Sequence, residues 1–142
     1  MEIKLCSSEK DHEAAFLVMK ELRPHLNFDQ YRSLIQAAHR ADHYQIYMAI
    51  DGDEIVGTMG VRLLYDFVHG KHLYIDDLVT TGKCRSKGIG SKLLKFSEQL
   101  AKNLGCQGLR LCTGIGNESG KRFYEREGWS LKSVAYKKSF SD

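Results

Sequence analysis

Hydrophobic and polar side chains follow two different periods along this chain of 142 residues. In the stretch 14–22, and again in Ile89–Leu104, apolar residues recur at the three- and four-residue spacing of a helix that buries one face. Between residues 44 and 80 the apolar residues form runs separated by short turn signals, which is typical of strands. The clearest turn is Asp51-Gly52-Asp53, because Asp-Gly tolerates the positive φ angles of a tight hairpin.

The order of these elements predicts the architecture. An antiparallel meander is followed by strand, crossover helix and strand, which favours an α/β fold with a mixed, mostly antiparallel sheet and helices on both faces. A length of 142 residues suits one core, so we expect a single domain over residues 1–142. We predict strands at Glu2–Cys6, Tyr44–Ile50, Glu54–Leu64, Lys71–Thr80, Leu109–Thr113 and Ser130–Tyr136. We predict one helix with an N-cap at Ser7, Ser8 or Asp11 that runs up to Pro24, and further helices at Asp29–Arg40, Ile89–Leu104 and Asn117–Glu127.

A glycine loop joins the predicted strand Lys71–Thr80 to the helix that follows it. Its sequence is Arg85-Ser86-Lys87-Gly88-Ile89-Gly90. Glycine lets the backbone come close to an anion, and the free N–H groups and positive dipole end of the helix then hold the charge. Open sheets bind ligands at this end of a strand. The loop therefore predicts a pyrophosphate site, although the same spacing also occurs in plain tight turns.

Composition and charge narrow the class of partner. The chain is 42% hydrophobic and 27% charged with a net charge of +3, as in an ordinary globular protein. Basic residues cluster at 83–87 and 137–138 rather than along a stripe, which favours a small polyanionic ligand over nucleic acid. No apolar run approaches the roughly 18 residues needed to span a bilayer, so we expect a cytoplasmic protein without a membrane partner.

The cysteines and histidines carry no recognisable metal signal. The four cysteines show neither paired metal spacing nor the density of a disulfide scaffold, so we expect reduced residues that serve in packing. The six histidines show no HExxH or HxH spacing, so we expect no metal. An acyl-cysteine intermediate at Cys84 or Cys112 has little support, because no histidine is near either residue in the sequence.

Two longer motifs stand in a fixed order around and after the glycine loop. The first is Tyr74-Ile75-Asp76-Asp77-Leu78-Val79-Thr80 with Arg85-x-x-Gly88-x-Gly90 behind it, and the second is Asn117-x-x-Gly120-x-x-Phe123-Tyr124-x-x-x-Gly128-Trp129. The pair resembles the signature motifs of the GNAT superfamily of N-acetyltransferases, and the element order matches that family throughout. The resemblance implies a GNAT-like acyl-CoA N-acyltransferase fold. It also implies transfer of an acetyl group from acetyl-CoA, as cosubstrate, to a primary amine of a small molecule or a peptide by direct attack.

The resemblance further implies where acetyl-CoA binds. The backbone of Leu78 and Val79 would pair with the pantetheine arm and polarise the thioester carbonyl, at a bulge that splays this strand from the next. Asn117 would bond the pantetheine or the coenzyme while capping its helix, and a plain N-cap is the alternative interpretation. The pyrophosphate would lie on the backbone amides of Arg85, Ser86, Lys87, Gly88, Ile89 and Gly90.

Tyr124 matches the tyrosine of the second motif, which makes it the expected proton donor. A thiol has a pKa of about 8.5 and a phenol a pKa of about 10, so the phenol can protonate the departing CoA thiolate without being ionised at neutral pH. Without the resemblance, Phe123 and Tyr124 are first interpreted as two core aromatics on one helix.

Asp76 and Asp77 are the expected bases for the attacking amine. Neighbours in a regular strand point to opposite faces, so at most one should face the acceptor unless the bulge turns both. The pair resembles that of spermidine/spermine and glucosamine-6-phosphate N-acetyltransferases, which have glutamate and then aspartate; Asp76 is one methylene shorter, which favours action through a water. The alternative is that either aspartate only accepts backbone N–H bonds around the bulge. His72 and Tyr74 share an alternating face with Asp76, so they are further candidates to line the acceptor pocket.

A non-catalytic CoA-binding or regulatory module of the same fold is the alternative function. Tyr124 and the acidic pair speak against it, because a binding module needs neither. No motif names the acceptor. We therefore expect an amine acceptor of open identity and no nucleic-acid partner, and we leave open whether the protein forms a homodimer.

Overall fold

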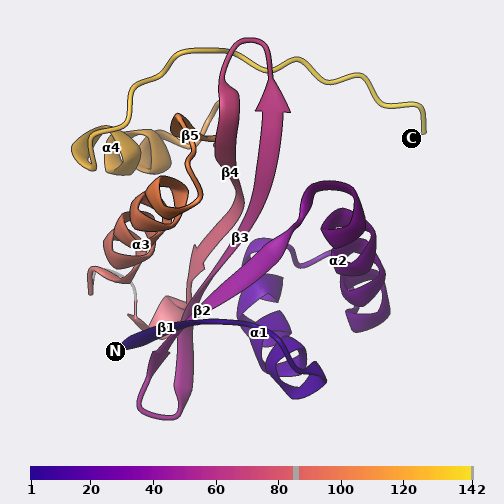
Figure 1. Cartoon of the computed structure of the whole chain (residues 1–142). Coiled ribbons are helices and arrows are strands. Elements are labelled where there is room, and N and C mark those ends of the chain that lie inside the picture. The colour runs from indigo at the N-terminus through magenta and orange to yellow at the C-terminus, as the bar shows by residue number, and fades with distance from the viewer. Residues whose placement is uncertain (85–86, 142) are drawn as a thin grey trace. The chain divides into compact units, whose positions relative to one another are not determined.

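The computed structural model describes residues 1–84 and 87–141 and divides into two compact units, Met1–Cys112 and Thr113–Asp142. The first unit holds the sheet and the helices that cover it, and the second holds a short helix and the C-terminal segment (Figure 1).

In the described part of the first unit, five strands form one mixed sheet in sequential order. Neighbouring strands are antiparallel except the last pair, which is parallel and is joined by a crossover helix. The predicted α/β class with a mixed, mostly antiparallel sheet is therefore confirmed. The strands are β1 (Glu2–Leu5), β2 (Gln45–Asp51), β3 (Glu54–Asp66), β4 (Gly70–Thr80) and β5 (Gly108–Leu111).

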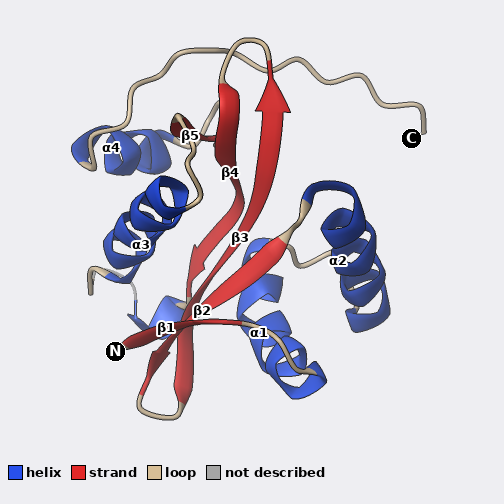
Figure 2. Cartoon of the chain, viewed as in Figure 1, coloured by secondary structure: helices blue, strands red, loops and turns tan. Residues whose placement is uncertain are grey.

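Helices cover both faces of this sheet, as predicted (Figure 2). On one face, the Thr58 hydroxyl of β3 lies 4.0 Å from the Met19 sulfur. The preceding residue, Gly57, faces the other side, where a Cβ would come within 3.0 Å of Ile89. Because successive strand residues point to opposite faces, these contacts put α1 and α3 on opposite sides. The helices are α1 (Glu9–Leu22), α2 (Phe28–Asp42) and α3 (Ile89–Asn103), and no helix that the structure describes is long and apolar enough to cross a membrane.

Capping residues set the ends of α1 and α2. Ser8 and Asn27 each form a capping box, in which the cap side chain accepts the N–H three residues on and that residue's side chain accepts the cap's own N–H. Of the three caps expected for the first helix, Ser8 is the one used. This helix ends at Leu22, and Arg23 becomes its C-cap beside the sheet.

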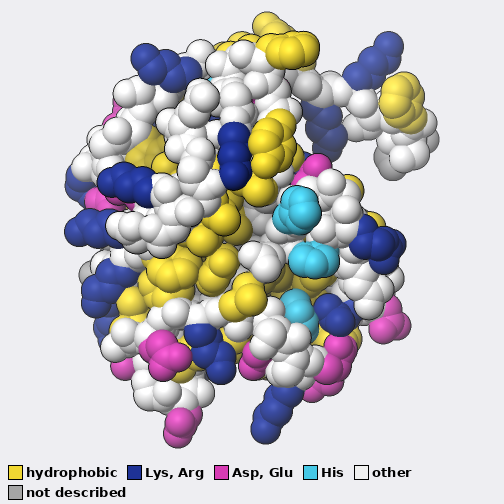
Figure 3. Space-filling view, viewed as in Figure 1, with side chains coloured by type: hydrophobic (Ala, Val, Ile, Leu, Met, Phe, Trp, Pro, Cys, Tyr) yellow, Lys and Arg dark blue, Asp and Glu magenta, His cyan; other side chains and the backbone are white. Residues whose placement is uncertain are grey.

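Charged side chains are spread over the visible surface. In Figure 3, Lys and Arg side chains lie scattered among other residues rather than in one continuous stripe. The apolar core lies beneath, between the sheet and the helices. Its most buried large side chains include Ile46, Met48, Met59, Leu73, Leu93 and Leu94.

A β-bulge lies in β4 at the acidic pair. Across β3, Gly60 pairs with Asp77 and Val61 pairs with Ile75, so Asp76 is the extra residue of the bulge. On its other edge, β4 pairs with β5 only from His72 to Ile75. Within the described residues, the rest of β4 pairs with β3 alone, which leaves backbone N–H and C=O groups free on that edge. The bulge and the splay implied by the family resemblance are both present.

The second unit contains α4 (Glu118–Arg126), close to its predicted bounds. The strand predicted at Ser130–Tyr136 is wrong, because residues 129–141 form neither helix nor strand. Leu131, Val134 and Tyr136 are 77%, 72% and 96% exposed. Their spacing of three and then two residues does not keep one apolar face, and a strand also needs a partner for its backbone hydrogen bonds.

Candidate functional site

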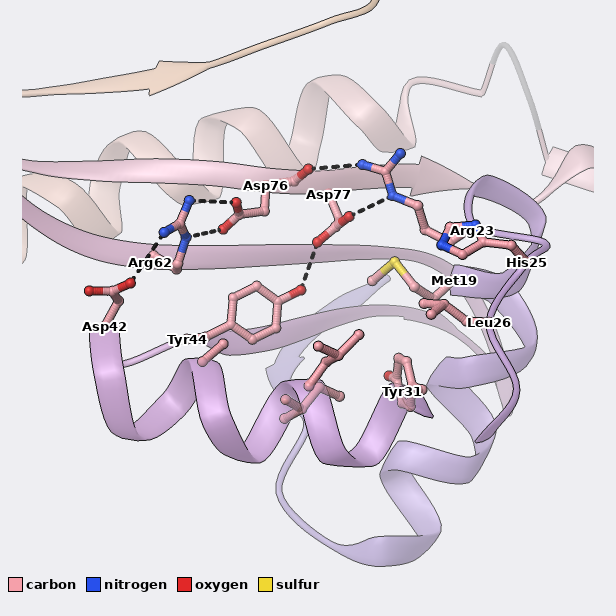
Figure 4. Close-up of a pocket in the computed structure, with 13 residues that line it drawn as sticks. Met19, Arg23, His25, Leu26, Tyr31, Asp42, Tyr44, Arg62, Asp76 and Asp77 are labelled. Carbon is pink, nitrogen blue, oxygen red and sulfur yellow. Dashed lines mark hydrogen bonds and ion pairs between the residues drawn. The ribbon is translucent and has the colours of Figure 1, made fainter. Parts of the chain in front are cut away.

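A cavity of about 520 Å³ lies in the first unit between α1, α2 and the strands β3 and β4 (Figure 4). Its sheet side carries the acidic pair of β4 together with Arg62 of β3. Its helix side is mainly apolar. The apolar lining comes from Met19, Leu26, Tyr31, Leu34, Ile35 and Ala38.

Arg62 holds the Asp76 carboxylate at this cavity. The Arg62 Nε donates to Asp76 Oδ2 at 2.7 Å and Nη2 donates to Oδ1 at 2.9 Å, so the pair is bidentate. The remaining Arg62 nitrogen, Nη1, donates to Asp42 Oδ2 at 3.2 Å. The carboxylate is therefore fixed in orientation, while each of its oxygens retains a lone pair for a further donor.

Arg23 and Tyr44 hold the neighbouring carboxylate of Asp77. The Arg23 Nε donates to Asp77 Oδ1 at 3.0 Å, and the Tyr44 hydroxyl donates to Oδ2 at 2.8 Å. Arg23 Nη2 also donates to the backbone carbonyl of Asp76 at 3.3 Å. The bulge is thus held by the guanidinium group of Arg23, which directly follows α1, and by the phenol of Tyr44, which directly precedes β2 (Figure 4).

Burial changes the proton affinities of these groups. Burial raises the pKa of Asp76, although the Arg62 guanidinium acts in the opposite direction. The hydrogen bonds and charge of Asp76 raise the pKa of Arg62. Burial, reinforced by the Asp77 charge, raises the pKa of Tyr44 well above that of an ordinary phenol. Tyr44 therefore stays a donor at neutral pH, and Asp76 is a stronger proton acceptor than an exposed aspartate.

The bulge turns both predicted aspartates toward one cavity, which a regular strand would not do. Both aspartates also pair with side chains, Asp76 with Arg62 and Asp77 with Arg23 and Tyr44. The alternative interpretation, in which either aspartate only accepts backbone N–H bonds around the bulge, does not account for these side-chain donors.

Sequence reasoning missed the three partners of the acidic pair. Tyr44 is the first residue of a predicted strand and carries no signal of its own, yet its hydroxyl reaches Asp77. Arg62 lies between apolar residues of a predicted strand, and an arginine in that setting signals a paired carboxylate. Arg23, next to Pro24, offers no such signal. His72 is only 1% exposed, and neither it nor Tyr74 lines the cavity.

The residues expected to bind acetyl-CoA in the first unit lie on the free edge of β4 and at the start of α3. Leu78 and Val79 pair with Met59 and Thr58 of β3, beyond the point where β5 ends its pairing. Gly88 is the N-cap of α3 with φ +76°, and a Cβ there would meet nothing within 4 Å.

The neighbours of Gly88 differ in what they can offer a ligand. Lys87 is exposed, whereas the Ile89 side chain is buried in the core, so Ile89 can offer only its backbone N–H. Gly90 lies in the first turn of α3. Arg85 and Ser86 lie outside the described residues.

The other expected site residues belong to the second unit. Asn117 caps α4, since its Oδ1 accepts the Gly120 N–H at 3.0 Å and its Nδ2 donates to Thr113 Oγ1 at 2.9 Å. Tyr124 is half-buried within α4, with its ring centroid 6.2 Å from that of Trp129. Burial raises the pKa of Tyr124, which keeps its phenol protonated at neutral pH.

The cysteines are free thiols of differing exposure. Cys6 is buried, and burial raises the pKa of its thiol to about 12. Cys112 is exposed, so the expectation that it serves in packing is wrong. Its position at the end of β5 explains this, because the sheet pairing stops one residue earlier.

The sequence model of the Acetyltransferase (GNAT) family matches residues 9–129. The chain belongs to this family. The expected GNAT-like acyl-CoA N-acyltransferase fold is thereby confirmed. The match includes the glycine loop, the acidic pair, Asn117 and Tyr124.

Two relatives match nearly the whole length of this GNAT protein. It is 28% identical over 137 residues to the uncharacterized N-acetyltransferase YhdJ of Bacillus subtilis (strain 168), covering 96% of both chains. It is 24% identical to the aminoalkylphosphonate N-acetyltransferase of Salmonella typhimurium, covering 97% of this chain and 90% of that one. Among solved structures, the aminoglycoside N-acetyltransferase AAC(6')-Iy in complex with CoA has the same fold, with a TM-score of 0.83, 16% identity and coverage of 99% and 96%. The protein is an N-acetyltransferase that uses acetyl-CoA as cosubstrate and an amine as acceptor.

Proposed function

We propose that the acceptor is a primary amine, small or peptide-borne, whose ammonium form is drawn into the cavity by the acidic pair of β4. The observation that carries this proposal is the convergence of Asp76 and Asp77 on one cavity at the bulge. Three carboxylates and two guanidinium groups line it, which leaves one net negative charge. The apolar helix side suits the body of the amine.

The proposed reaction is a direct transfer. The neutral amine attacks the thioester carbonyl carbon, a C–N bond forms, and the C–S bond breaks to release the CoA thiolate. The amine proton passes through a water to Asp76, whose pKa is raised by burial. Asp77, held by Arg23 and Tyr44, adds negative charge that favours the developing cation.

Two further groups complete the proposed chemistry. Tyr124 gives its phenolic proton to the CoA thiolate, which is a weaker base than an alkoxide but still leaves more easily when it is protonated. Asn117 holds the pantetheine arm with the Nδ2 hydrogen that Thr113 leaves free, while its Oδ1 caps α4.

The backbone supplies the remaining cofactor contacts. Leu78 and Val79 pair with pantetheine along the free edge of β4, and the amides from Arg85 through Ser86 and Lys87 to Gly90 hold the pyrophosphate. Gly88 supports this role, because its positive φ and open surroundings leave the α3 amino terminus accessible.

An amine that also carries an anionic group is a second candidate acceptor. The relative from Salmonella typhimurium acts on aminoalkylphosphonates, and Arg23 is 43% exposed at the cavity. A guanidinium group binds a phosphonate well. This candidate predicts a different charge preference from the first.

A thiol-release assay separates these alternatives. Acetyl-CoA and the full chain are mixed with matched amines of similar size: a diamine, a neutral alkylamine and an aminoalkylphosphonate. Faster release with the diamine supports the cationic acceptor. Release with the aminoalkylphosphonate alone would favour the second candidate, an amine whose anionic group binds to Arg23. No release with any amine, combined with tight CoA binding, would instead favour the non-catalytic CoA-binding module.

A further inference from the structure

Three side chains of the types that bind metal ions lie together at the tip of the β3–β4 hairpin, outside the acceptor cavity. Asp66 ends β3, His69 closes the turn and His72 is the third residue of β4. One donor atom from each lies within 4.8 Å of the others. The spacing Asp-x-x-His-x-x-His is not a familiar metal motif, so only the fold reveals the cluster.

A hydrogen bond at one ring nitrogen of His72 leaves the other nitrogen able to bind a metal ion. Its Nδ1 lies 2.9 Å from the Gly70 carbonyl oxygen, which fixes the ring hydrogen on Nδ1 and leaves a lone pair on Nε2. Metal-bound histidines usually donate their other ring N–H to such an acceptor. His72 is also 1% exposed, so its Nε2 is held in one direction by packing.

The distances within the cluster suit a four-coordinate ion. With metal–ligand bonds of about 2.0–2.1 Å, the ligand atoms of a tetrahedral site lie about 3.3 Å apart. His69 Nδ1 lies 3.0 Å from Asp66 Oδ2, and His72 Nε2 lies 3.9 Å from the same oxygen. These separations lie on either side of the ideal value, so small side-chain adjustments suffice. The Asp66 carboxylate is already aimed by the His69 backbone N–H, which donates to Oδ1 at 2.6 Å.

The positively charged side chain of Arg110 in β5 contacts this cluster. Its Nε donates to His72 Nε2 at 3.1 Å, and its Nη2 lies 3.9 Å from Asp66 Oδ2. The guanidinium also lies 4.8 Å from the Tyr74 ring centroid, a favourable cation–π position. A metal ion that binds His72 Nε2 must displace the Arg110 Nε–H from that nitrogen. The guanidinium can keep its cation–π contact with the Tyr74 ring when this hydrogen bond is lost.

We propose that Asp66, His69 and His72 form a binding site for a divalent transition-metal ion of the zinc type. Two imidazoles and one carboxylate are ligands that Zn²⁺ and Co²⁺ accept, and three protein ligands leave one coordination position for water. The ion ties the end of β3 to the start of β4 through the turn. The site is independent of acetyl transfer, since none of its residues lines the acceptor cavity.

The test uses the untagged full chain, freed of metal with a chelator and dialysed. Titration with Zn²⁺ by calorimetry, and with Co²⁺ by visible absorption, should give one ion per chain and a tetrahedral Co²⁺ spectrum. His69→Ala and Asp66→Asn should each weaken binding by about tenfold or more. Asp66→Asn keeps an oxygen for the His69 N–H, so it preserves the turn.

Two further variants sharpen the result. His43→Asn removes an exposed histidine with φ 57°, which asparagine tolerates, so its affinity should equal that of the parent. Arg110→Met removes the competing cation and should tighten binding several-fold. Weaker binding by Arg110→Met, absence of saturable binding by the parent, or full retention of binding in both His69→Ala and Asp66→Asn would overturn the proposal.

Discussion

Gly60 and Tyr44 are matched across the sheet: a Cβ on Gly60 would overlap the hydroxyl and ring of Tyr44. The Tyr44 ring crosses β3 at this point to reach Asp77, and Gly60 is the residue that pairs with Asp77 in the ladder. The absent side chain therefore provides the passage for the phenol. This relationship links a glycine inside a strand to the orientation of a carboxylate in the acceptor cavity.

The Gly60→Ala variant tests this relationship. The new methyl must expel the Tyr44 ring, which is 9% exposed and well packed, so we expect the free energy of unfolding to fall by about 1–3 kcal/mol. The rate of acetyl transfer should fall as well, because Asp77 loses a partner. Urea denaturation and the thiol-release assay measure the two effects.

Tyr44→Phe is the matched comparison for Gly60→Ala. It removes the hydrogen bond to Asp77 but keeps the ring, so it should destabilise by about 0.5–1.5 kcal/mol. If Gly60→Ala proved as stable as the parent, the close fit between the two residues would be incorrect.

The architecture could be predicted because its signals are local. Ser8 and Asn27 cap their helices through residues three positions away, and Asp51-Gly52 closes its hairpin by its own φ preference. The family motifs likewise predicted a bulge in β4, since they refer to a continuous stretch of that strand, but they placed it at Leu78 and Val79 whereas it lies at Asp76.

The partners of the acidic pair could not be predicted, because they depend on register. Arg62 of β3 binds Asp76 of the neighbouring strand β4, so their contact depends on how the two strands are paired. Arg23 binds Asp77 although the two residues are 54 positions apart in the sequence. A shift of one residue in register would turn Arg62 to the other face. The predicted strand Ser130–Tyr136 fails for a related reason: strand propensity alone supplies no hydrogen-bonding partner.

Asp76→Asn should depress kcat/KM most strongly near neutral pH and recover partly as the pH rises. Near neutrality most of the amine is protonated and needs a base, whereas at high pH the free amine is abundant. Because burial raises the pKa of Asp76, the parent should also lose activity on acidification at a higher pH than an ordinary aspartate would give. Rate profiles from about pH 4 to 9.5 measure both effects.

Asp42→Asn is the control for this variant. Asp42 also pairs with Arg62, at 3.2 Å, but its hydrogen bond is single rather than bidentate. It should leave the shape of the pH profile unchanged. A constant activity ratio between Asp76→Asn and the parent across the whole range would remove Asp76 as the base.

The same raised pKa has a consequence for stability. A carboxyl group that binds its proton more tightly in the folded than in the unfolded state favours folding most at low pH. This contribution is fully present below the ordinary aspartate pKa of about 3.8, and it is lost as the pH rises through the raised pKa of the folded state. The free energy of unfolding of the parent should therefore exceed that of Asp76→Asn by a margin that grows as the pH falls, which urea unfolding at several acidic pH values measures.

Tyr124→Phe should lower kcat by about tenfold to a thousandfold with little change in acetyl-CoA affinity. The phenol acts on the thiolate only as the C–S bond breaks, so its loss affects the transition state more than cofactor binding. Tyr136→Phe, at a tyrosine that is 96% exposed, is the control and should be silent. An unchanged kcat in Tyr124→Phe, with chemistry shown to be rate-limiting, would assign Tyr124 to packing.

Gly88→Ala should weaken acetyl-CoA binding much more than a matched change elsewhere. Gly88 and Gly52 both have positive φ, +76° and +64°, and a Cβ at either would meet nothing within 4 Å. Each alanine should therefore cost a similar strain of about 1–2 kcal/mol in folding free energy. Of these two glycines, Gly88 is the one that caps α3 at the proposed pyrophosphate site, where the backbone must approach an anion.

Calorimetry with CoA measures the effect. The affinity for CoA should fall strongly in Gly88→Ala and be lost when Gly90→Ala is added, while Gly52→Ala binds CoA like the parent. Equal affinities for Gly88→Ala and Gly52→Ala would place the pyrophosphate elsewhere.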